Sequence, residues 1–122
     1  MFAYELQDKV KAHNKQVKVF VCHPGASNTT LKRESASFLT RISWTFMVKI
    51  GLAQSAEQGA YPEVICATEE NLKQLAYYGP TGLMNFGGPV GECKLEDFAV
   101  DKKVLTKLWA VSEEATEFSW QL

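Results

Sequence analysis

The sequence carries few side chains of the kinds that perform nucleophilic or metal chemistry. Its three cysteines are Cys22, Cys66 and Cys93, an odd number at wide spacings, and no two of them form a Cys-x-x-Cys pair. Cys22 precedes His23 directly, but neighbours on a strand point to opposite faces and cannot jointly grip a metal ion without a bend. We therefore predict no metal site and a reducing, cytoplasmic setting.

The strongest strand pattern of the chain is followed by a turn that contains proline and glycine. Residues 17–22 read VKVFVC, a β-branched and aromatic run typical of a strand that is covered on both faces. Pro24 lacks an amide hydrogen for the sheet and Gly25 permits unusual backbone angles, so the chain leaves the sheet there. On its own this pattern also fits an ordinary strand-ending turn, and His23 fits a hydrogen-bonded histidine better than a catalytic one.

Helical periodicity accounts for most of the remaining chain. Apolar positions at helical spacing predict helices over residues 2–15, 37–50 and 101–118, the last capped by Asp101. Ser55 with Gln58 three residues later predicts a capping box for a helix through residue 69, which Pro62 either kinks or begins. Residues 77–82 read as a turn cluster, and residues 83–86 as a short strand.

These elements predict the last part of an α/β sheet protein with only about two strands and flanking helices. A parallel strand needs neighbours on both edges, and no capping side chain precedes the first helix. We therefore expect residues 1–122 to form a single incomplete domain. The open edge would be covered by an upstream segment, or by a second copy of the chain in a homo-oligomer or swapped dimer.

Charge and hydropathy exclude several classes of partner. Thirteen basic and fourteen acidic residues give a formal charge of −1, so neither sign is in the excess that nucleic acid or anionic lipid would select. The most apolar stretch, residues 38–53, is interrupted by Arg41 and Lys49 and is short for a membrane span. We expect no nucleic-acid partner and no membrane span, and an aromatic and methionine stripe here is more typical of a core.

Residues 19–29, VFVCHPGASNT, resemble the segment of short-chain dehydrogenases/reductases in which a hydrophobic strand runs into Pro-Gly-x-x-x-Thr. The histidine before the proline is similar to the retinol dehydrogenase-like and protochlorophyllide reductase-like branch. Residues 2–7, 55–62, 77–82 and 108–113 resemble further signatures of that branch in the same order. The resemblance implies the C-terminal portion of a Rossmann-like, doubly wound parallel sheet that binds NAD or NADP.

The resemblance also implies where the cofactor would lie. Pro24, Gly25 and Thr29 match the motif and would line the nicotinamide end of the site, with Ala26 contributing backbone only. No catalytic residue carries over, because no tyrosine is followed four residues later by lysine, as the family's proton donor requires. The glycine-rich turn for the diphosphate is also missing.

The sequence therefore indicates a fragment of an NAD(P)-dependent oxidoreductase for an alcohol or carbonyl substrate, inactive by itself. By the same resemblance, the segment after the turn would form a lid with an apolar pocket wall. The basic pair at residues 32 and 33 could face a cofactor phosphate, although a solvated surface pair is the simpler reading. The alternative is a small non-catalytic protein that uses a truncated Rossmann scaffold for self-association or partner binding.

Overall fold

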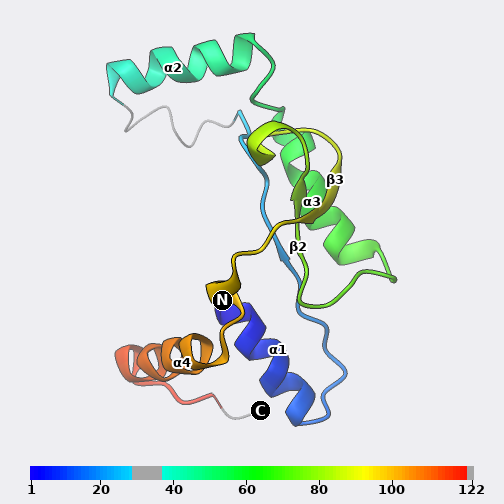
Figure 1. Cartoon of the computed structure of the whole chain (residues 1–122), viewed down its shortest axis with the longest axis vertical. Coiled ribbons are helices and arrows are strands. Elements are labelled where there is room, and N and C mark those ends of the chain that lie inside the picture. Colours follow the sequence, from blue (N-terminus) through cyan, green and yellow to red (C-terminus); the bar gives the residue numbers. More distant parts are fainter. Residues whose placement is uncertain (29–36, 121–122) are drawn as a thin grey trace. The chain divides into compact units, whose positions relative to one another are not determined.

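The structure is a computed structural model that describes residues 1–28 and 37–120, and Figure 1 shows the path of the chain. The helices are α1 (Phe2–Ala12), α2 (Phe38–Lys49), α3 (Ala56–Thr68) and α4 (Lys102–Thr116), with short 3-10 turns η2 (Leu83–Asn85) and η3 (Asp97–Ala99). The strands are β1 (Val21–Cys22), β2 (Tyr77–Pro80) and β3 (Val90–Cys93). The protein is thus α/β, as the sequence predicts.

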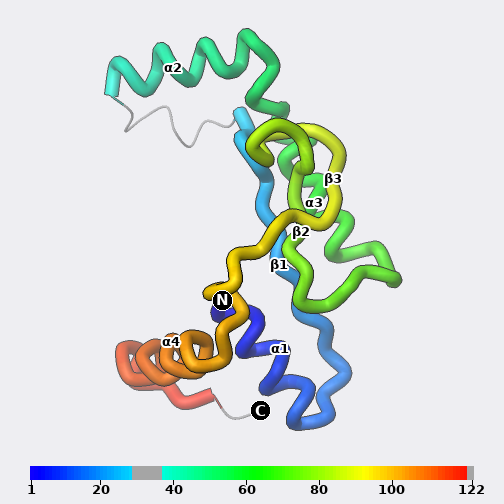
Figure 2. Tube along the Cα trace, in the orientation of Figure 1, coloured from blue at the N-terminus to red at the C-terminus, as the bar shows by residue number. Residues whose placement is uncertain are grey.

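The chain divides into two compact units, which the tube in Figure 2 allows the reader to follow by colour. The first unit comprises Met1–Val21, Lys73–Ala76 and Lys94–Leu122, and the second comprises Cys22–Leu72 and Tyr77–Cys93.

In the first unit, α1 packs against α4 through an aromatic seam. The ring of Phe2 stacks on Trp109 with centroids 4.4 Å apart, and the ammonium of Lys9 lies 5.0 Å from the same indole ring. Leu105 is almost completely buried beside them in α4, and Lys102 forms an ion pair with Asp8. Burying such large apolar side chains is the main stabilising contribution to this unit.

The N-termini of α4 and α3 are capped by the side chains that the sequence predicts. Asp101 accepts hydrogen bonds from the amides of Lys103 and Val104, at 2.8 and 3.4 Å. Ser55 and Gln58 form the predicted capping box, each side chain bonding the other's amide at 3.1 Å. These bonds satisfy amides that the first helical turn leaves without partners.

Apart from Val21 of β1, the second unit holds a three-stranded mixed sheet in the order β1-β2-β3. β2 and β3 run antiparallel, with Tyr77 opposite Cys93 and Pro80 opposite Val90. Helix α3 packs against β2 and β3, and Pro62, although interior to α3, is completely buried there. A proline inside a helix loses one backbone hydrogen bond, a cost that burial of its ring offsets in part.

The strands differ from the sequence predictions more than the helices do. The run at residues 17–22 forms a strand only at its last two residues, the predicted turn at Tyr77–Pro80 is strand β2, and the predicted strand at residues 83–86 is the 3-10 turn η2. β3 was not predicted. Its partner β2 contains a Gly-Pro pair that ordinarily marks a turn. The alternation of apolar and polar residues that is typical of a strand could therefore not be recognised in β2.

Helix α2 is the other departure from expectation. Its predicted bounds hold, with Ser37 accepting a hydrogen bond from Thr40 N and Gly51 just beyond its end at φ +74°. However, α2 buries no residue, and Phe38 and Phe46 are 76% and 62% exposed. The prediction that this apolar stripe forms core is therefore wrong within the described chain. Of the helices in the described ranges, none is long and apolar enough to cross a membrane.

Candidate functional site

The turn that follows β1 is held in a conformation that only glycine adopts easily. Gly25 has φ +65°, and a Cβ added to it would lie 2.5 Å from Pro80 Cγ and 2.6 Å from the Phe86 carbonyl oxygen. Both the backbone angle and the close approach exclude a side chain at this position. Gly25 therefore places the turn directly against the end of β2 and the segment that follows it.

The backbone of the turn is bonded on both sides. Ala26 N donates to Phe86 O at 2.7 Å, while Gln54 N donates to Ala26 O and Asn28 N donates to Gln54 O, each at 2.9 Å. The side chain of Gln54, which is buried, donates from Nε2 to Pro24 O at 2.6 Å. Gln54 thus contacts the turn through its backbone and its amide, and it fixes the turn's shape before any ligand arrives.

His23 links this turn to strand β3. Gly25 N donates to His23 Nδ1 at 3.2 Å, so the ring proton of the neutral imidazole lies on Nε2, which contacts Cys93 Sγ at 3.6 Å. The Cys93 thiol in turn lies 3.7 Å from the Pro80 carbonyl oxygen. The ring of His23 also stacks on Tyr77, with centroids 4.8 Å apart. The result is a continuous chain of polar contacts from the turn to the sheet.

The electrostatics of this chain of contacts argue against an activated nucleophile. Burial lowers the pKa of His23 and raises the pKa of Cys93, so both groups are neutral near pH 7. A catalytic cysteine needs the opposite shifts, with a thiolate stabilised by an imidazolium. Burial also raises the pKa of Tyr77, which removes it as a base. The contacts of His23 and Cys93 therefore hold the turn against the sheet.

A shallow depression of about 510 Å³ lies beside the turn, in the same unit. Gln54 belongs both to its wall and to the turn. The wall is formed by Gly51, Leu52, Ala53, Gln54, Ser55, Gln58, Gly82, Leu83, Gly87 and Gly88. None of these residues is charged, so the depression suits an uncharged polar group such as an amide or hydroxyl rather than a phosphate.

The structure describes only some of the residues that the sequence predicts to bind the cofactor. Pro24, Gly25 and Ala26 lie together in the turn, whereas Thr29 and the basic pair at residues 32 and 33 lie outside the described residues. Among the described residues, no three His, Cys, Asp or Glu side chains gather so as to hold a metal ion.

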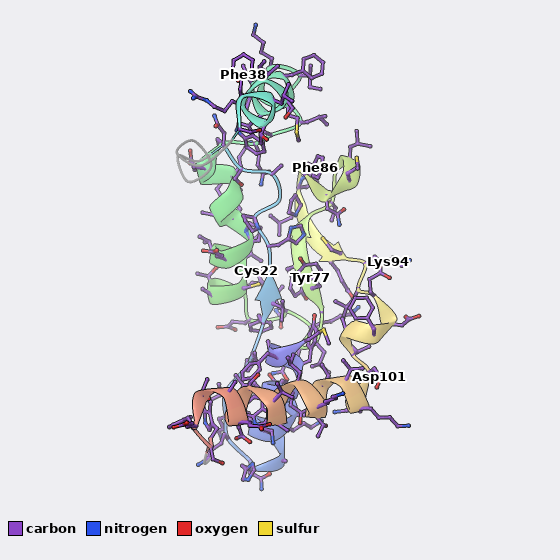
Figure 3. The ribbon with its side chains drawn as sticks, turned by 90° about the vertical axis from the view of Figure 1, so that its left-hand side faces the viewer. Cys22, Phe38, Tyr77, Phe86, Lys94 and Asp101 are labelled. Carbon is purple, nitrogen blue, oxygen red and sulfur yellow. The ribbon has the colours of Figure 1, made fainter. Side chains whose placement is uncertain are left out.

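Sequence reasoning missed Gln54 and the contact between His23 and Cys93. The signal that could have found them is a glycine within an element, which marks a close approach of another chain segment. A Cβ on Gly79 of β2 would overlap the His23 ring, and one on Gly59 of α3 would overlap Ser27 of the turn. Figure 3 shows α3 and the strands β1 and β2, which carry the labelled Cys22 and Tyr77.

Comparison with known proteins adds a likeness of fold. No family model matches this chain, and no curated protein matches it. A crystal structure of an uncharacterized protein from Mycobacterium paratuberculosis superposes on 99% of this chain with a TM-score of 0.62, at 20% sequence identity. The chain spans 36% of the length of that protein. The arrangement described above therefore also occurs as part of a larger chain.

Proposed function

We propose that this chain is the C-terminal part of an NAD(P)-dependent short-chain dehydrogenase/reductase with a Rossmann-like sheet, acting on an alcohol or carbonyl substrate. The observation that carries the proposal is the turn Pro24–Ala26 after β1, with Gly25 at positive φ pressed against Pro80 and Phe86. Dinucleotides bind at the carboxyl ends of strands in such sheets, where a glycine lets the backbone approach the ligand. In the similar crystal structure this fold is part of a longer chain, which is consistent with the residues described above forming part of a larger domain.

The turn suits the nicotinamide end of the cofactor better than its diphosphate. The amides of Gly25, Ala26 and Asn28 already donate to groups of the chain, so the turn lacks the row of open amides that holds a diphosphate. The uncharged depression beside Gln54 suits a carboxamide or ribose instead. Thr29 would add a hydroxyl at this end, as the family resemblance implies. The cofactor supplies the hydride chemistry, while these residues orient its nicotinamide ring.

The proton donor and the diphosphate site would come from outside these residues, since the chain holds no Tyr-x-x-x-Lys. Calorimetric titration of NADH and NADPH into this chain, and into one extended through the preceding reading frame, tests the proposal. We expect binding to the extended chain alone, weakened there by Thr29→Val. Absence of binding to both chains would overturn the proposal, as would an extension lacking both Tyr-x-x-x-Lys and the glycine-rich turn.

The exposed face of α2 favours a second candidate, a non-catalytic protein that self-associates as a homo-oligomer or swapped dimer. Phe38, Leu39, Ile42 and Phe46 are each more than half exposed, and contiguous apolar surface of this kind commonly marks an interaction site. Light scattering coupled to gel filtration measures the mass directly. This candidate predicts a mass above that of one chain that returns to the monomer value in Phe38→Ser/Phe46→Ser. A monomer at every concentration would exclude it.

A further inference from the structure

Helix α4 carries a second apolar stripe beside the side that packs against α1. Leu105 and Trp109 lie on the packed side and are 1% and 3% exposed, and the Trp109 ring stacks on Phe2 of α1. Val104, Leu108 and Val111 are instead each at least 36% exposed. Figure 3 shows α4 in front of α1, so that one side of the helix is turned away from it. Part of the surface of α4 is therefore apolar and open to a partner.

The spacing of this stripe is that of a seam between two helices. Val104, Leu108, Val111 and Ala115 follow one another at intervals of four, three and four residues. This spacing keeps apolar side chains along one line when two helices pack side by side. Exposed apolar residues that line up in this way commonly mark an interaction surface. The stripe spans about two heptads, so a helix of similar length fits it.

The charged residues at one edge of the stripe change sign along α4. Lys103 and Lys107 lie in its first half and Glu114 lies in its second half, and all three are exposed. Lys107 and Glu114 directly precede Leu108 and Ala115 of the stripe, so they share one edge of it. The helix dipole favours acidic residues near the N-terminus and basic residues near the C-terminus, which is the reverse of this order. A partner surface with the opposite order of charges would compensate for it.

We propose that α4 pairs with α4 of a second copy of the chain, side by side and in the opposite direction. A two-fold axis across the middle of the stripe places Leu108 against the partner subunit's Val111. The same axis brings Lys107 opposite the partner subunit's Glu114, and Glu114 opposite the partner subunit's Lys107. A parallel pair would instead bring the two basic halves together and the two acidic halves together. The charges therefore specify the antiparallel direction.

The self-complementary pattern selects a second copy as the occupant. In a two-fold interface the same patch forms both sides, so each charge must meet its opposite within that patch, as Lys107 and Glu114 do. The pairing uses α4 of the first unit and does not depend on the proposed cofactor site. It is also separate from self-association through α2, which belongs to the second unit. The two kinds of association can therefore be distinguished by substitution.

The pairing should be weak and concentration-dependent. Two helices of 15 residues bury less than the about 800 Å² per partner that is typical of a stable interface. The apolar stripe contributes most of the affinity, whereas exposed ion pairs contribute little each and mainly set the direction. We expect a dissociation constant in roughly the micromolar range or above.

Sedimentation equilibrium in the Phe38→Ser/Phe46→Ser background tests the proposal, because these substitutions remove association through α2. We expect a monomer–dimer equilibrium that persists in this background. Lys107→Glu and Glu114→Lys should each raise the dissociation constant about tenfold, since each replaces two attractive contacts by two repulsive ones. An equimolar mixture of the two variants should regain the parental affinity, because the mixed dimer again places opposite charges together at both contacts.

A charge reversal elsewhere in the same unit serves as the matched control. Lys11→Glu changes the net charge of the chain as Lys107→Glu does, but it lies on the exposed surface of α1, so the dissociation constant should stay at the parental value. Circular dichroism checks that each variant keeps its helices.

Three results would overturn the inference. The first is a monomer at every concentration, which would leave an upstream segment as the occupant of the stripe. The second is the loss of all association in Phe38→Ser/Phe46→Ser, which would assign association to α2. The third is a mixture of Lys107→Glu and Glu114→Lys that associates no better than either variant alone, which would exclude the antiparallel pairing.

Discussion

The substitution Gly79→Ala tests the packing that holds the turn in place. Gly79 lies in the interior of β2, opposite Gly91, and its φ is not in the left-handed region. Alanine is therefore compatible with the backbone. The obstacle is the imidazole of His23, since the new Cβ would lie 2.8 Å from Cε1 and still closer to Nε2 and Cδ2. The ring must move, and its contact with Cys93 must break.

The expected cost follows from these contacts. Forcing a methyl group into a packed site costs about 1–3 kcal/mol, and each hydrogen bond lost from the imidazole adds roughly 1 kcal/mol. Replacing glycine removes freedom from the unfolded chain and returns roughly 0.4–1 kcal/mol. The free energy of unfolding of Gly79→Ala should therefore fall by about 2 kcal/mol. Urea denaturation followed by far-ultraviolet circular dichroism measures this change.

A matched control and a rescue isolate the cause. Gly87 also has no positive φ, but its Cβ would meet the nearest atom, Gln54 Oε1, at an ordinary 3.4 Å, so Gly87→Ala should change stability by less than about 0.5 kcal/mol. In a His23→Ala background Gly79→Ala should lose most of its effect, because the clashing ring is gone. Equal effects of Gly79→Ala and Gly87→Ala would refute the placement of His23 over β2.

Further predictions concern the core, a helix cap and the response to pH. Leu105→Ala should lower the free energy of unfolding by about 2–5 kcal/mol because Leu105 is 1% exposed, whereas Val111→Ala, at a half-exposed position of α4, should cost far less. Asp101→Ala should cost roughly 1 kcal/mol through loss of the α4 cap, measured by the same urea titration. Because burial lowers the pKa of folded His23 below its unfolded value near 6.5, stability should be complete above that pH and should decline as the pH falls through the folded pKa. The decline should be smaller in His23→Asn, and an NMR titration of the His23 ring should give a pKa below 6.5.

The helices were predictable because each of their signals is local. The caps at Ser55 and Asp101 lie within a few residues of the backbone groups they serve, and both occur where the spacing placed them. The strands were not predictable in the same way. Tyr77–Pro80 pairs with a segment ten or more residues later, and burial by that partner and by α3 outweighs the turn preference of its Gly-Pro pair.

In the candidate site, too, local features were predictable and contacts between distant residues were not. The turn residues Pro24 and Gly25 carry a local signal and lie where the strand run ends. The residues that hold the turn lie far away in sequence, Gln54 beyond α2 and Cys93 at the end of β3, and their side chains carry no pattern of their own. Only the fold brings them together, so a local spacing argument cannot find them.

The hydrogen bonds that hold the turn limit the groups with which a ligand can bind there. The amides of Gly25, Ala26 and Asn28 donate inside the chain, and the carbonyl oxygens of Pro24 and Ala26 accept from Gln54. A ligand therefore meets a turn that is already ordered, and binding need not supply the entropy cost of ordering it. It must also leave those bonds intact or replace them, because each bond contributes roughly 1 kcal/mol. Recognition at this turn then depends on shape and on the remaining carbonyl and hydroxyl groups, contacts that would suit the nicotinamide of the proposed cofactor better than its diphosphate.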